Sequence, residues 1–92
     1  MKQENAIITV ECRLILAENI DAYLDLTKSS LQDLATKMNT SRQRIHNVKQ
    51  GKVNPTLEFL DSLAKAMKCE VKDLFTKKYF NQFKLAIVKK TK

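Results

Sequence analysis

Apolar side chains recur at helical spacing in three stretches of the chain. In the clearest stretch, positions i, i+3, i+4 and i+7 carry Leu31, Leu34, Ala35 and Met38. The same kind of stripe recurs further along the chain, at Leu57, Leu60, Leu63, Ala64 and Met67. An upstream stripe carries Leu16, Ile20, Tyr23 and Leu24. These stripes predict amphipathic helices over roughly 14–26, 31–38 and 57–67, packed around one core.

A very short connection follows the helix predicted over 31–38. Asn39 can adopt the left-handed conformation that closes a helix, and Ser41 can cap the next one, as Ser30 can cap the helix at 31. About three residues between two helices force a sharp corner. We therefore predict a helix-turn-helix over residues 31–50.

The second helix of that pair, 42–50, is mostly polar. Its two strongly apolar residues, Ile45 and Val48, lie on one side and can anchor it. At 100° per residue the opposite face carries Gln43, Asn47 and Gln50, with His46 beside them and Arg42 and Arg44 on the flanks. A face of amides and guanidinium groups without an acid suits base edges and phosphates.

Turn signals follow this helix. Gly51 ends it, Pro55 keeps the preceding residue out of a helix, and Thr56 can cap the helix at 57. A short last helix follows, with Val71, Leu74 and Phe75 inward. The β-branched runs 6–10 and 85–88 either pair as a small two-stranded ribbon or extend helices.

Length and composition favour one all-α domain. The chain has 92 residues, 43% of them apolar, enough for one compact core. One Gly and one Pro are too few for the regular turns of an all-β fold. We expect a domain over residues 14–76, with an N-terminal extension over 1–13 and a basic C-terminal extension over 77–92.

The basic charge is unevenly placed. Formal net charge is +7, and the whole excess lies in residues 47–92. No acid occurs between Asp33 and Glu58, nor from Thr76 to the end of the chain. Such segments attract polyanions, although a solvated lysine face explains many basic runs.

The sequence lacks the residues that several classes of function need. Cys12, Cys69 and His46 make neither a disulfide framework nor a metal site, and no catalytic constellation is visible. We expect two free thiols, no cofactor and no enzyme. Without a signal segment or an apolar run near ~20 residues, we expect a cytoplasmic protein that does not enter membranes.

Taken together, the motifs of residues 30–75 resemble the Cro and phage-repressor type of helix-turn-helix domain. The resemblance rests on Ser30, Leu34-Ala35, Ser41, Ile45, Val48, Gly51-Lys52, Asn54-Pro55, the Leu-rich stretch ending at Ala64, and Asp73-Leu74-Phe75. It implies a compact five-helix, lambda-repressor-like domain that binds double-stranded DNA. It also implies a third helix in the major groove and a dimer on a two-fold operator.

The resemblance also implies site residues. Its base-contacting positions fall on Arg42, Gln43 and Asn47, and the helical wheel adds His46, Arg44 and Gln50. Its phosphate-contacting positions fall on Thr40, Ser41, Lys52 and Asn54, to which we add Gln32 and Lys49.

The chain departs from the family pattern at three places. Leu31 replaces a common Gln that touches a phosphate, so that contact is lost or passes to Gln32. Asn39 replaces a common turn Gly. The usual ion pair between the first and third helices is absent, since its positions hold Leu24 and Lys49. For Lys49 the sequence leaves three partners open: Asp21, Asp25 or a phosphate.

The sequence therefore predicts a homodimeric transcriptional repressor of phage, plasmid or bacterial origin that binds a palindromic operator. One alternative is an antitoxin that represses its own operon and binds a toxin through its terminal segments. Another is an adaptor that uses the same scaffold to bind proteins and not DNA. We expect Tyr79, Phe80 and Phe83 to pack on the core or on a second subunit rather than to stack on bases.

Overall fold

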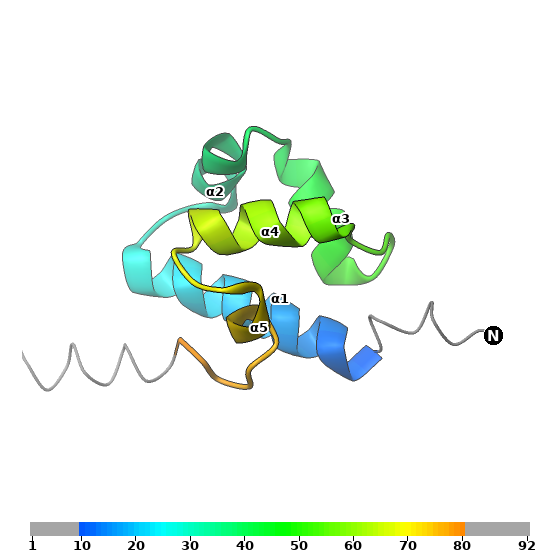
Figure 1. Cartoon of the computed structure of the whole chain (residues 1–92). Helices are drawn as coiled ribbons and strands as arrows, with labels where there is room; N and C mark the ends of the chain where they lie inside the picture. Colours follow the sequence, from blue (N-terminus) through cyan, green and yellow to red (C-terminus); the bar gives the residue numbers. More distant parts are fainter. Residues whose placement is uncertain (1–9, 81–92) are drawn as a thin grey trace, which may run out of the picture.

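The computed structural model describes residues 10–80, which form five helices and no strand (Figure 1). The helices are α1 (Val10–Thr27), α2 (Leu31–Met38), α3 (Arg42–Gln50), α4 (Leu57–Ala66) and α5 (Val71–Leu74). The predicted all-α fold with a helix-turn-helix over 31–50 is confirmed.

The main difference from the sequence prediction lies at the start of α1. This helix begins at Val10 rather than near Leu14, so its first turn lies in the segment expected to be an extension. Exposed Val10 and Leu14 give this turn little amphipathic signal, while Glu11 suits the positive end of a helix. Val10, the last residue of the run 6–10, therefore belongs to a helix. The other residues of the expected ribbon lie outside the described residues.

The helices form a small bundle around one core. Figure 1 shows α2 and α3 above α1, with α4 crossing in front and α5 beside α1. α1 contacts α3 and α5, while α2 contacts α3 and α4. The core joins the predicted stripes to a residue near the end of the described chain. Its largest fully buried apolar side chains are Leu16, Ile20, Leu34, Ile45, Leu63, Met67, Leu74 and Val48.

The aromatic residues after α5 belong to this core. Phe80 is buried and meets the rings of Tyr23 and Tyr79 edge to face, at centroid distances of 5.6 and 4.9 Å. The hydroxyl of Tyr23 donates to the carbonyl of Ala66 and accepts from Lys37 Nζ. Tyr23 therefore ties α1 to α2, to α4 and to the last described residues. The expected packing is confirmed for Phe80 and Tyr79, whereas Phe83 lies outside the described residues.

The predicted caps are present. Ser30 accepts from the backbone N–H of Asp33, whose carboxylate accepts from the N–H of Ser30. These hydrogen bonds from Ser30 lower the pKa of Asp33 below its ordinary value. Ser41 and Thr56 cap α3 and α4 with one bond each, accepting from the N–H groups of Arg44 and Phe59. The helix boundaries thus follow from local sequence chemistry.

A buried amide on α1 holds the end of α5. Asn19, only 1% exposed, is the one buried polar side chain among residues 10–80. Its Nδ2 donates to the carbonyls of Leu74 at 2.8 Å and Thr76 at 3.0 Å. These carbonyls end a helix too short to be stable alone, so Asn19 supplies partners that the helix itself lacks.

We expect Asn19→Leu, which keeps the branching of the side chain but removes its N–H groups, to lower the free energy of unfolding by about 2 kcal/mol or more, because buried carbonyls lose their donor. Urea denaturation at constant pH measures the change. The neighbouring variant Glu18→Ala, on the exposed side of α1, should cost less than about 0.5 kcal/mol. Equal stability of Asn19→Leu and the wild type would show that this amide does not hold α5.

Candidate nucleic-acid interface

The corner between α2 and α3 has the geometry that the sequence predicts. Asn39 adopts the left-handed conformation, with φ 58°, and its N–H donates to the carbonyl of Thr36. The N–H of Thr40 donates to the carbonyl of Ala35 at 2.9 Å. Ser41 is already the cap of α3. The turn is therefore closed by hydrogen bonds from both sides, which fixes the angle at which α3 leaves α2.

Two apolar side chains anchor α3. Ile45 and Val48 are its buried residues. Arg42, Gln43, His46 and Gln50 are exposed and Asn47 is half-buried, on the side away from the anchors. The structure therefore brings five of the six predicted base-contacting residues onto one accessible surface of α3, which we call the reading face.

Two amides of the reading face are joined to each other. Gln43 Nε2 donates to Asn47 Oδ1 at 3.0 Å, one helical turn further along. Residues four apart on a helix are neighbours, so this bond needs no distortion. It holds two amide planes in a defined relation on the exposed side of α3.

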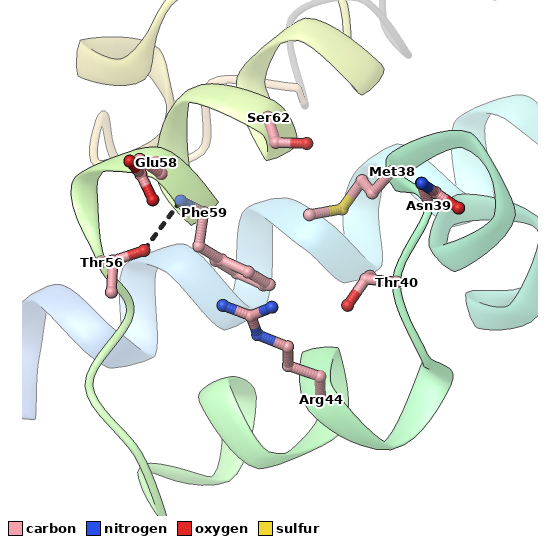
Figure 2. Close-up of a pocket in the computed structure, with 8 residues that line it drawn as sticks. All are labelled: Met38, Asn39, Thr40, Arg44, Thr56, Glu58, Phe59 and Ser62. Carbon is pink, nitrogen blue, oxygen red and sulfur yellow. Dashed lines mark hydrogen bonds between the residues drawn. The ribbon is translucent and has the colours of Figure 1, made fainter.

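Arg44 is placed apart from the reading face. Its guanidinium carbon lies 5.1 Å from the ring centroid of Phe59 on α4, a cation–π contact. Figure 2 shows Arg44 reaching across a pocket toward that ring. The pocket encloses about 170 Å³, between the turn after α2 and the start of α4. Its lining residues are Met38, Asn39, Thr40, Arg44, Thr56, Glu58, Phe59 and Ser62. In this arrangement Arg44 holds α3 to α4.

Lys49 is placed on the opposite flank of α3. Its ammonium forms an ion pair with Asp21 of α1. The Lys49 side chain is 17% exposed, against 62% for Asp21. Of the three partners that the sequence left open, the structure selects Asp21. Asp21 lies three residues before Leu24, the first-helix position of the family's ion pair, so the link between α1 and α3 uses a different residue of α1.

Arg13 adds a second tie between α1 and α3, which the sequence analysis missed. Its Nη1 donates to the backbone carbonyl of Lys49 at 3.1 Å, in the last turn of α3. A cation there also suits the negative end of the helix dipole. No motif marks this contact, because residues 36 apart in sequence meet only once the helices pack.

Two features favour a glycine at the end of α3. Gly51 has φ 79°, a conformation that costs other residues energy. A methyl group on Gly51 would also lie 2.5 Å from Nε and 2.7 Å from Cδ of Arg13. The Arg13 side chain therefore occupies the space that a side chain at position 51 would need.

The residues expected at phosphates lie at both ends of α3 and on α2. Ser41 is exposed and Thr40 half-buried before α3, while Lys52 and Asn54 are exposed in the loop after it. Gln32 is exposed on α2, with Nε2 donating to Thr36 Oγ1 at 3.4 Å. All of these except Gln32 adjoin α3 in the chain. Lys49 alone has its charged group engaged by an acid.

Other chemistry finds little support among the described residues. Within 10–80, no three His, Cys, Asp or Glu side chains gather as a metal site, and no helix has the length and apolar character to cross a membrane. Cys12 and Cys69 are not joined in a disulfide. Burial, with Asp73 and Glu70 nearby, raises the pKa of Cys69 to about 11, which keeps this thiol protonated at neutral pH.

A capped corner between two helices, with a polar and acid-free second helix facing outward, defines the helix-turn-helix class of DNA-binding proteins. Residues 19–78 match the family model of the Cro/C1-type HTH DNA-binding domain. The chain therefore belongs to the Cro/C1-type helix-turn-helix family, as the sequence motifs indicated. No curated protein and no solved structure gives a significant match.

The close approach of the Arg13 side chain to Gly51 can be tested by substitution. A non-glycine residue in the left-handed conformation costs about 1–2 kcal/mol. We expect Gly51→Ala to lower the free energy of unfolding by more than this, because the Arg13 side chain must also move. In an Arg13→Ala background the same substitution should cost only the backbone part. Urea denaturation of the wild type, the two single variants and the double variant measures the coupling. Strictly additive losses would contradict a contact between the two positions.

Proposed function

We propose that this protein is a transcriptional repressor that binds a palindromic operator as a homodimer, with the reading face of each α3 in the major groove. One observation carries the proposal. Arg42, Gln43, His46, Asn47 and Gln50 share an accessible, acid-free surface on a helix held by the core and by both neighbouring helices. The amides match the donor and acceptor pairs of base edges, and a rigid support is what specificity requires.

The ends of α3 supply the contacts that position it on DNA. Thr40 and Ser41 lie at its N-terminus, where free N–H groups favour phosphate oxygens. Lys52 and Asn54 follow its C-terminus on an exposed loop, and Gln32 is exposed on α2. In this proposal these residues fix the register on the duplex, and the reading face selects the sequence. Arg44 and Lys49 support α3 from its two flanks.

The proposal is tested by selecting binding sites from random duplex DNA with the whole chain and then measuring competition against unrelated DNA. We expect two symmetric half-sites about 34 Å apart, a dimer on the selected site, and strong preference over competitor. Equal affinity for selected and unrelated duplexes would overturn sequence-specific regulation. Binding of another protein without any salt-sensitive DNA binding would favour an adaptor instead.

Base reading and phosphate binding should respond differently to substitution. With about six phosphate contacts per dimer, log K should fall by about five per tenfold rise in salt. We expect Lys52→Ala to weaken binding to every sequence and to reduce that slope by about one for each subunit. Asn47→Ala should instead reduce the preference for the selected site with little change in slope. Fluorescence anisotropy at several salt concentrations measures both quantities.

Lys65→Ala is the matched control for charge. Lys65 is an exposed lysine of α4 that pairs with Asp61 at 3.3 Å, and it takes no part in the proposed contacts. This variant also removes one positive charge from each subunit. Because Lys65 makes no proposed phosphate contact, the salt slope should stay unchanged. If Lys52→Ala and Asn47→Ala lose affinity in parallel at every salt concentration, the proposed division between the two kinds of contact is wrong.

A further inference from the structure

The bond between Gln43 and Asn47 determines which of their atoms remain available. A primary amide has two N–H donors and one carbonyl oxygen. Because Gln43 Nε2 donates to Asn47 Oδ1 at 3.0 Å, Gln43 keeps its oxygen and one N–H. The Asn47 oxygen uses one of its two lone pairs in this bond, so the unengaged part of the Asn47 amide consists mainly of its two N–H groups. The two side chains therefore present different edges, although both are amides.

Each edge matches a different base in the major groove. An amide that offers an oxygen and an N–H pairs with adenine, accepting from N6 and donating to N7. An amide that presents its N–H groups can donate to N7 and O6, the two acceptors that guanine displays in the major groove. The hydrogen bond thus gives two chemically similar side chains different preferences, Gln43 for adenine and Asn47 for guanine.

We infer that Gln43 and Asn47 form one coupled reading unit, in which Gln43 recognises adenine and Asn47 recognises a guanine at a neighbouring base pair. This inference rests on the proposed function and adds base identity to it. No acid lies on α3 to compete for the amide N–H groups. Loss of either partner frees the other amide to rotate, so each residue affects the preference at both base pairs.

The test measures dissociation constants at one salt concentration for the wild type, Gln43→Ala, Asn47→Ala and the double variant. The DNA is the selected operator and versions in which either base pair is replaced, together with 7-deazaadenine and 7-deazaguanine, which lack the N7 acceptor. For the wild type, we expect each replacement to weaken binding about 5- to 150-fold, the range of a good bidentate contact. Each single variant should lose most of the discrimination at both base pairs, and the double variant should lose little more.

The near-isosteric variant Gln43→Glu separates hydrogen bonding from packing. A carboxylate cannot donate to N7, so this variant should lose the preference for adenine while circular dichroism and melting temperature stay close to those of the wild type. Unchanged adenine preference in this variant would overturn the assignment of Gln43.

Two other results would also overturn the inference. If each alanine variant affects one base pair only and the losses multiply in the double variant, the residues read independently. If Asn47→Ala removes only the adenine preference and Gln43→Ala only the guanine preference, the two residues have the opposite assignments. In both cases a wild-type preference for the operator leaves the proposed function standing, whereas absence of any preference refutes both.

Discussion

The orientation of α3 depends on a small apolar anchor. Only Ile45 and Val48 bury side chains in the core, because the rest of the helix is polar. Two apolar contacts three residues apart define one side of a helix but leave it free to roll about its axis. Polar contacts on the flanks remove that freedom. Arg44 stacks on Phe59 of α4, and Lys49 pairs with Asp21 of α1.

The same contacts explain how a basic helix divides its charges. Arg44, although exposed, contacts α4, and Lys49 contacts α1, while Arg42 lies exposed beside the amides. Arg13 approaches from α1 and completes the end of α3, where the backbone carbonyl of Lys49 needs a donor. The positive charge of this region therefore serves two purposes. Part of it fixes the helix, and the rest is available to the polyanion that the composition suggests.

Much of the fold followed from the sequence because it is encoded locally. The bounds of α2 and α3 came from the caps Ser30 and Ser41, the left-handed Asn39 and the closing Gly51, each of which acts within a few residues. The reading face followed from helical geometry once its two anchors were known. The first turn of α1 was missed, since its apolar residues are exposed and give no stripe.

The contacts that join distant segments were not predictable in the same way. Asn19 interrupts the apolar stripe of α1, a signal that a buried amide has a partner, but nothing local points to the end of α5. The pairing of Lys49 was one of three possibilities, since two acids on α1 lay within reach. The cation–π contact between Arg44 and Phe59 depends on how α4 is placed relative to α3. All three contacts are set by packing between helices.

The most direct measurement is an NMR titration of the isotopically labelled chain with its selected operator, following the side-chain amide signals of asparagine and glutamine. If α3 reads the major groove, the signals of Gln43 and Asn47 shift on binding. The signal of Asn19, buried against α5, should keep its position because the fold does not change. Shifts at Asn19 without any at Gln43 and Asn47 would contradict recognition by α3.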